Sequence, residues 1–145
     1  GCIINTASML SFFGGGLVPG YSASKGGVAQ LTKSLAIAYA ADGIRVNAVA
    51  PGWIASSGMD TYGGAMKSLI PTLRQHVPLR RMGEEAEVSA VVVFLLSPGA
   101  AFVTGITVQI DGASSLGSEV FPLGKTSKSV PFDGFHRAVT PEVLK

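Results

Sequence analysis

A tyrosine and a lysine stand four residues apart in the stretch Gly-Tyr-Ser-Ala-Ser-Lys-Gly, residues 20–26. On a helix, residues at this spacing share one face, so we expect the side chains of Tyr21 and Lys25 to project side by side. A phenol has an ordinary pKa near ~10, and a cation within ~4–6 Å favours its ionised form. Because only small residues separate the two, the pair can exchange a proton with a ligand on this face.

A third candidate, Ser8, lies thirteen residues before Tyr21, just after a short apolar segment at residues 2–4. Open α/β sheets bind ligands at the carboxyl ends of their strands. A serine hydroxyl there can hydrogen-bond a substrate oxygen to which Tyr21 gives a proton. Taken singly, each residue also has an ordinary interpretation: Tyr and Lys at this spacing are usually two half-exposed helix residues, and a serine often ends a strand.

The elements that must position these side chains alternate between strand and helix. Apolar or alternating patterns predict strands at residues 2–4, 44–49 and 106–110. Helical spacing and end signals predict helices at residues 21–41, 64–76 and 84–96. This alternation predicts an α/β fold with a parallel sheet.

The first predicted helix carries a set of apolar residues at helical spacing. Its members are Val28, Leu31, Leu35 and Ala38. From residue 114 onward the periodic pattern fades, and three prolines are spread over the segment. We expect this tail to run over the surface.

Four motifs occur in one order at close spacing. They are Asn-Thr-Ala-Ser at 5–8, Tyr-Ser-Ala-Ser-Lys-Gly at 21–26, Arg-Val-Asn-Ala-Val-Ala-Pro-Gly at 45–52, and Thr-Gly with Asp-Gly at 104–105 and 111–112. As a set they resemble the carboxyl-terminal half of a short-chain dehydrogenase/reductase, over residues 1–115. The resemblance implies the carboxyl-terminal part of a Rossmann-like doubly wound parallel sheet, about three strands with flanking helices. Residues 116–145 would then form a surface tail or a subunit-contact extension.

The resemblance also implies a role for each site residue. Tyr21 would be the general acid/base for hydride transfer between a nicotinamide and an alcohol or carbonyl. Lys25 would favour the ionised tyrosine and bond the nicotinamide ribose, and Ser8 would position the substrate oxygen. The implied cofactor-binding residues are Tyr21, Lys25, Pro51, Gly52, Trp53, Ile54 and Ser56. Ser56 replaces a threonine that is frequent in the family, a change that keeps the hydroxyl.

Other features allow a functional and a structural interpretation. Trp53 would line the substrate site or pack in a core or an interface. The glycine triplet at 14–16 does not fit a dinucleotide fingerprint, since Pro19 stands where a glycine is needed, and we interpret it as a flexible rim. Arg80 and Arg81 would contact an acidic substrate or, as we prefer, form a solvated basic corner. We expect Asn47 to be structural, tying its strand to the following turn.

A complete member of the family begins with a strand and a glycine-rich turn that binds the pyrophosphate, followed by a residue that selects the adenine ribose. The resemblance also implies a catalytic asparagine before the serine strand. None of these features lies in this chain. Because the residue that selects between NAD and NADP is among them, we expect the cofactor to be either NAD or NADP. The start at Gly1, without a methionine, looks like a cut, and we expect the chain alone to be inactive.

Residues 87–98 and 102–105 and the extended tail resemble the branch that holds citronellol dehydrogenases and peroxisomal trans-2-enoyl-CoA reductases. Enoyl reductases of this branch often lack the full Tyr/Lys pair, so the intact Tyr21 and Lys25 favour an alcohol or carbonyl on an apolar substrate. Enoyl-CoA reduction is the alternative enzymatic function. A non-catalytic, oligomerising α/β module is the alternative of another class.

The composition excludes several further classes of function. The net charge of +2, without any Lys/Arg run longer than two, predicts no nucleic-acid partner. The longest strictly apolar run, residues 90–96, is far shorter than the ~20 residues of a membrane span, so we expect no membrane partner. A single cysteine excludes an internal disulfide, and two distant histidines argue against a metal site. We expect a cytoplasmic homo-oligomer, dimer or tetramer, that acts on a small-molecule substrate, although a targeting signal could precede the chain.

Overall fold

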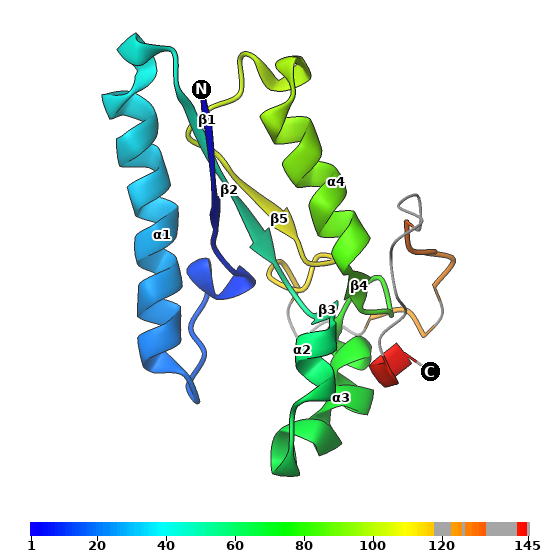
Figure 1. Ribbon diagram of the computed structural model, residues 1–145. Helices are drawn as coiled ribbons and strands as arrows, with labels where there is room; N and C mark the ends of the chain where they lie inside the picture. Colours follow the sequence, from blue (N-terminus) through cyan, green and yellow to red (C-terminus); the bar gives the residue numbers. More distant parts are fainter. Residues whose placement is uncertain (118–122, 126, 133–141, 145) are drawn as a thin grey trace.

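The computed structural model describes residues 1–117, 123–125, 127–132 and 142–144. Its main sheet has three parallel strands in the order β1 (Cys2–Thr6), β2 (Arg45–Pro51) and β5 (Thr107–Ile110) (Figure 1). Ile3 pairs with Val46 and Val49 with Val108, so the carboxyl ends of the strands lie at one edge. The predicted parallel sheet of about three strands is therefore confirmed.

Two helices cover opposite faces of this sheet (Figure 1). They are α1 (Pro19–Ala38) and α4 (Glu85–Leu96). α1 begins two residues before the predicted start, because proline fits the first turn of a helix, where its missing N–H costs nothing. It ends before the predicted end, and the chain turns through a short 3-10 helix, η2 (Ala40–Asp42), into Gly43, whose φ is +67°.

The face that α1 turns toward the sheet carries Val28, Thr32 and Ala36. Val28 packs against the alanine cluster of Ala7, Ala48 and Ala50. One turn further, Thr32 is fully buried, and its hydroxyl accepts a hydrogen bond from the Asn5 side chain at 3.0 Å. Leu31, which belongs to the apolar set at helical spacing, is 49% exposed. The small residues of the buried face allow the helix to lie close to an alanine-rich sheet.

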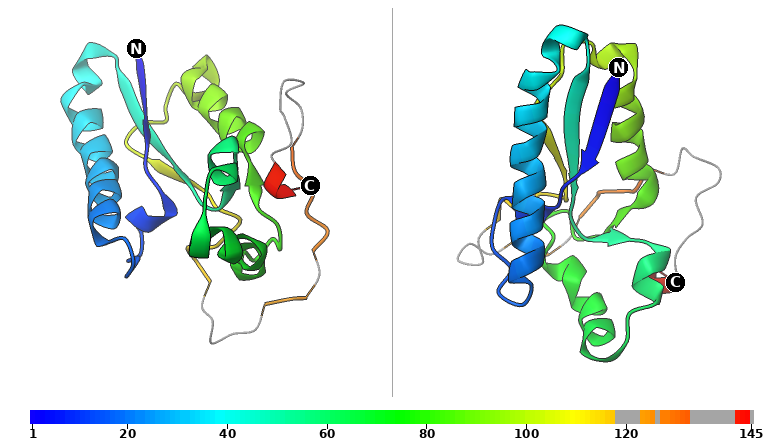
Figure 2. Two further views of the ribbon diagram at one scale, coloured as in Figure 1. Left: turned by 60° about the horizontal axis from the view of Figure 1, so that its bottom comes forward. Right: turned by 60° about the vertical axis from the view of Figure 1, so that its left-hand side comes forward.

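A second, smaller layer lies beyond the carboxyl ends of the main strands (Figure 2). It holds two parallel strands, β3 (Ile54–Ala55) and β4 (Gly83–Glu84), and two helices, α2 (Ser57–Asp60) and α3 (Gly64–His76). The predicted bounds of α3 are confirmed. The two short strands and α2 were not predicted, because segments of two to four residues carry no periodic pattern.

Hydrogen bonds from buried side chains fix the long connections. The Asn47 amide donates to the Val103 carbonyl at 2.8 Å and its oxygen accepts from the Ile106 N–H at 3.2 Å. The structural role predicted for Asn47 is confirmed, although its partners precede β5 rather than following β2. Three further 3-10 helices complete the described elements: η1 (Met9–Ser11), η3 (Pro98–Ala100) and η4 (Glu142–Leu144).

The tail beyond residue 117 is described only in part. Residues 129 and 130 contact Arg81, and η4 packs beside α2 (Figure 2). Within the described residues, no helix is both long and apolar enough to cross a membrane.

Candidate active site

The first turns of α1 carry Tyr21 and Lys25 on one face. The Lys25 ammonium lies over the Tyr21 ring, 5.6 Å from its centroid. The same ammonium donates a hydrogen bond to the carbonyl of Thr6, the last residue of β1, at 2.8 Å. The helix is thereby fastened to the carboxyl end of the strand, and the predicted proximity of the two side chains is observed.

This arrangement leaves polar capacity for a ligand. An ammonium has three donors, and within the described part of the chain the Lys25 ammonium uses one of them. Tyr21 is 47% exposed, and its hydroxyl makes no hydrogen bond to any described residue. A substrate oxygen or a ribose hydroxyl can therefore approach both groups from solvent.

Ser8 follows β1 and is buried, with 7% of its surface exposed. It caps η1, and its Oγ accepts a hydrogen bond from the Leu10 N–H at 3.2 Å. A hydroxyl that accepts one bond still has its proton to donate. Ser8 thus sits in a fixed backbone turn at the strand end, and its hydroxyl retains a donor for another oxygen.

Ser11 links the serine turn to the helix, a role that we did not predict. Its hydroxyl accepts from the Ser8 N–H at 3.2 Å and donates to the Lys25 carbonyl at 2.7 Å. Ser8 and Lys25 are therefore held by one intervening side chain as well as by the strand. The signal in the sequence was the Ser-x-x-Ser spacing of residues 8 and 11, which fits a capping box around a short helical turn.

In the glycine triplet at 14–16, Gly15 contacts the start of α1, while Gly14 and Gly16 are exposed. The Gly15 N–H donates to the Ser22 hydroxyl at 3.2 Å, and the Gly15 carbonyl accepts from the Val18 N–H at 3.0 Å. A Cβ at Gly15 would lie 3.1 Å from a Val18 methyl carbon and 3.2 Å from one of Leu10. The segment is thus an ordered turn at the start of α1.

The exit of β2 brings Pro51 and Gly52 beside the exit of β5. Pro51 pairs with Ile110, and the Gly52 N–H donates to the Ile110 carbonyl at 3.0 Å. A Cβ at Gly52 would lie 2.6 Å from the Asp111 Cβ and 2.7 Å from its Cα. Only glycine allows the two backbones to approach this closely.

The remaining predicted cofactor residues continue from this turn. The Trp53 carbonyl accepts from the Gly83 N–H at 2.9 Å, Ile54 pairs with Gly83 in the small sheet, and Ser56 precedes α2. Trp53 and Ile54 line a cavity of about 370 Å³ together with residues of the turn after β5. Trp53 also packs against the core cluster under α3, so its predicted core role is observed.

The two groups of predicted residues lie at neighbouring strand ends. Thr6 pairs with Val49, and the Ala7 N–H donates to the Val49 carbonyl at 2.8 Å. The Ser8, Tyr21 and Lys25 group follows β1, and residues 51–56 follow β2. None of Ser8, Tyr21 and Lys25 lines the 370 Å³ cavity. Of the two groups, only the second contributes to its lining, through Trp53 and Ile54.

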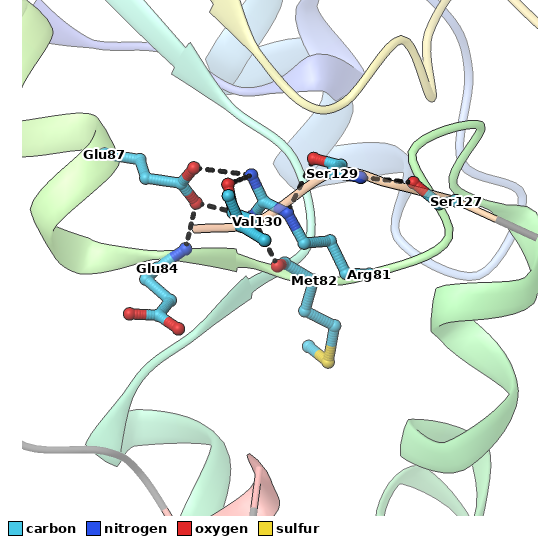
Figure 3. A network of polar contacts seen from close by, with 7 residues as sticks. All are labelled: Arg81, Met82, Glu84, Glu87, Ser127, Ser129 and Val130. Carbon is cyan, nitrogen blue, oxygen red and sulfur yellow. Dashed lines mark hydrogen bonds and ion pairs between the residues drawn. The ribbon is translucent and has the colours of Figure 1, made fainter. Parts of the chain in front are cut away.

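From the sequence, Arg81 was interpreted as part of a solvated basic corner. In the structure it forms a bidentate ion pair with Glu87 instead (Figure 3). The two nitrogen–oxygen distances are 2.8 and 2.6 Å. Glu87 also accepts from the Glu84 N–H at 2.9 Å, and Arg81 donates to the Ser129 hydroxyl at 2.9 Å. The pair therefore joins the start of α4 to the tail.

The ion pair shifts the pKa of both partners. Hydrogen bonding from Arg81 lowers the pKa of Glu87 below its ordinary value, and partial burial opposes this shift. The Glu87 carboxylate raises the pKa of Arg81 in the same way. Both groups are therefore charged at neutral pH, and the sequence predicted neither the partner nor the contact with the tail.

The chain is 44% identical over 112 residues to 2-dehydro-3-deoxy-D-gluconate 5-dehydrogenase of Bacillus subtilis (strain 168), covering 77% of this chain and 44% of that protein. It is 42% identical over 113 residues to cyclohexanol dehydrogenase of Acinetobacter sp. (strain SE19), covering 78% and 43%. An Agrobacterium tumefaciens crystal structure with bound NADP, described as a 2-deoxy-D-gluconate 3-dehydrogenase, matches at 39% identity with a TM-score of 0.72, covering 79% of this chain and 46% of that one.

The chain therefore spans less than half the length of these relatives. They are dehydrogenases of several kinds and do not single out the citronellol dehydrogenase and enoyl-CoA reductase branch. The sequence profile of the family described as enoyl-(acyl carrier protein) reductase matches residues 1–114. Because this match covers most of the chain, the chain belongs to the short-chain dehydrogenase/reductase family.

Proposed function

We propose that the protein is an NAD- or NADP-dependent oxidoreductase that interconverts an alcohol and a carbonyl on an apolar substrate. The observation that carries this proposal is the hydrogen bond from the Lys25 ammonium, which lies over the Tyr21 ring, to the Thr6 carbonyl at the end of β1. The attachment fixes a phenol and a cation at the strand ends, where open α/β sheets bind their ligands.

In the proposed reaction, Tyr21 gives a proton to the carbonyl oxygen during reduction and removes it during oxidation. A proton transfer of this kind needs an accessible hydroxyl, and that of Tyr21 has no partner among the described residues. The Lys25 cation lies over the Tyr21 ring, and the Ser8 hydroxyl donates to the same substrate oxygen. The capping bond that Ser8 accepts leaves its proton available for this role.

We propose that the cofactor binds at the carboxyl end of β2, next to the end of β1. Bound NAD or NADP would supply or accept the hydride. Lys25 retains donors for a ribose hydroxyl, and the turn of Pro51, Gly52, Trp53, Ile54 and Ser56 would hold the nicotinamide end. The relative with bound NADP supports this class of cofactor, and either form of the nucleotide is compatible with the residues present.

An alcohol or carbonyl is the preferred substrate class because the Tyr21 and Lys25 pair is intact. The relative named cyclohexanol dehydrogenase supports an alcohol on an apolar ring. Enoyl-thioester reduction is the second candidate, favoured by the description of the matching family. The similarity to citronellol dehydrogenases and trans-2-enoyl-CoA reductases remains part of this proposal.

We further propose that turnover requires a nucleotide-anchoring segment that is not among these residues. The chain contains no glycine-rich turn of the dinucleotide-binding type, and the relatives are more than twice its matched length. This chain alone is then inactive, with residues 1–115 forming the chemical half of the domain and residues 116–145 a tail or subunit contact. Leu31 and Ile37 of α1, 49% and 81% exposed, support burial of that helix in a homo-oligomer.

A substrate screen on the complete protein tests the proposal. Aliphatic and cyclic alcohols, their ketones or aldehydes, and enoyl-CoA thioesters would each be assayed with NAD(H) and NADP(H). We expect turnover of at least one alcohol and its carbonyl partner. Reduction of enoyl-CoA alone would establish the second candidate, and cofactor binding without any turnover would favour the non-catalytic module.

A further inference from the structure

A second cavity, of about 760 Å³, is lined by residues of α2, α3 and the C-terminal 3-10 helix η4. Its volume falls within the ~300–1,000 Å³ of small-molecule sites. Neither Ser8, Tyr21 and Lys25 nor the residues of the 51–56 turn line it. The cavity is therefore separate from the residues assigned to the proposed reaction.

The floor of this cavity is apolar. Met59, Ile70 and Met82 are buried, with 6–8% of their surfaces exposed, and belong to one core cluster. Val143 of η4 packs against the same cluster and also lines the cavity. A hydrocarbon chain that entered the cavity would lie against these side chains and leave water.

One face of α3 places two cations over this floor. Lys67, Ile70, Pro71 and Arg74 line the cavity, and their spacing of three or four residues puts them on one side of the helix. Lys67 and Arg74 are exposed. Neither side chain makes a hydrogen bond or an ion pair with any residue that the structure describes.

The other charged residues around the cavity have protein partners. Arg81 is paired with Glu87, and Arg80 donates to the carbonyls of Gln75 and Gly124. The Asp60 carboxylate accepts from the backbone N–H groups of residues 142 and 143, at 3.3 and 3.1 Å. Glu142 also lines the cavity and makes contacts of its own. Among the described cavity residues, Lys67 and Arg74 are thus the cations whose donors are all available to a ligand, and Arg80 adds a positive charge whose donors bond carbonyl oxygens.

We propose that this cavity binds an amphipathic anion, with its hydrocarbon chain on the Met59, Ile70 and Met82 floor and its head group held by Lys67 and Arg74. Charge-assisted hydrogen bonds from lysine or arginine suit a carboxylate or a phosphate equally. A neutral chain of the same length meets the same floor without the ionic contacts. The site stands independently of the oxidoreductase function.

Calorimetric titration of the complete protein tests this site with four probes: decanoate, decyl phosphate, decanol and inorganic phosphate. We expect both decyl anions to bind at least tenfold more tightly than decanol, and inorganic phosphate to bind more weakly still. If one of the two anions, decanoate or decyl phosphate, binds more than tenfold more tightly than the other, its head group is the one that the site prefers. Equal binding of decanol and the two anions, or no binding of either anion, would overturn the proposal.

Variants separate the site from non-specific binding. We expect Lys67→Gln and Arg74→Gln each to weaken decanoate binding roughly tenfold and to leave decanol binding unchanged, since each removes one ionic contact. Glu142→Gln should strengthen decanoate binding, because it removes a negative charge from the rim. Lys33→Gln, at an exposed lysine of α1, is the matched control and should change nothing. Unchanged decanoate binding in the Lys67→Gln, Arg74→Gln double variant contradicts the assignment.

Discussion

At the scale of single residues, the sequence predicted the neighbours in the proposed site but not the side chain that connects them. A spacing of four on a helix is enough to place Lys25 beside Tyr21, because helix geometry alone fixes which residues share a face. The role of Ser11 depends on a loop and a helix meeting fourteen residues apart along the chain. No local pattern specifies such a contact, so only the structure reveals it.

The link through Ser11 leads to a prediction about catalysis. Ser11→Ala removes the acceptor of the Ser8 N–H and the donor to the Lys25 carbonyl, so both residues gain freedom to move. We expect kcat to fall about tenfold with KM nearly unchanged, because small misplacements of reacting groups have large effects on rate.

Steady-state kinetics of the complete protein would measure this change, and Ser11→Thr should restore much of the rate. Ser34→Ala is the matched control. The Ser34 hydroxyl also donates to a helix carbonyl, but Ser34 lies nine residues beyond Lys25 along α1. If Ser11→Ala and Ser34→Ala have the same kcat as the parent protein, Ser11 has no positioning role.

At the scale of elements, long periodic segments were predicted and short or close-packed ones were not. α3 was predicted with its observed bounds, while β3 and β4, of two residues each, were missed. The apolar spacing predicted the helix but not its buried face, where the alanine-rich sheet accommodates Thr32 and Ala36 while Leu31 is exposed. Closeness of packing, rather than hydrophobicity, selected that face.

Close packing also determines the effect of substitution at Gly52. Gly52→Ala would place a methyl group against the backbone and Cβ of Asp111, which cannot move without breaking the turn after β5. We expect the free energy of unfolding to fall by about 1–3 kcal/mol, as in other overpacked sites.

Chemical denaturation of the two proteins would measure this loss. Gly14→Ala serves as its control, because a Cβ at Gly14 meets nothing within 4 Å. A loss at Gly52 no larger than that at Gly14 would show that the strand exits separate more easily than the distances indicate.

At the scale of the whole molecule, the Arg81 and Glu87 pair joins the Rossmann-like part to the tail (Figure 3). The sequence showed a charged residue at each end of this contact, but a pair six residues apart across a strand and a helix start has no sequence signature. The tail partners of Arg81, Ser129 and Val130, lie 48 and 49 residues after it in the sequence, and no sequence pattern predicted these contacts either.

This pair makes stability depend on pH. The folded-state pKa of Glu87 lies below its unfolded value, so its contribution is present above about pH 4 and is lost as the pH falls through the folded-state value. We expect Glu87→Gln to lower the free energy of unfolding by about 1 kcal/mol at neutral pH, with the difference from the parent protein shrinking in acid.

Urea denaturation at several pH values would measure both curves. Glu85→Gln, two residues before Glu87 at an exposed position of α4, is the control and should show a smaller difference at every pH. A constant gap between the Glu87→Gln and parent curves from neutral to acid pH would mean that the ion pair is not its source.

The central claim is that Tyr21, held beside Lys25 at the end of β1, exchanges a proton with the substrate oxygen. The most direct test is kcat of Tyr21→Phe in the complete protein, measured with an alcohol or carbonyl that the parent protein turns over. We predict a fall of about 10²–10⁴-fold, the usual contribution of a positioned acid or base, while Tyr39→Phe at the other end of α1 stays at the parent rate. A kcat for Tyr21→Phe within a few-fold of the parent value would contradict the claim.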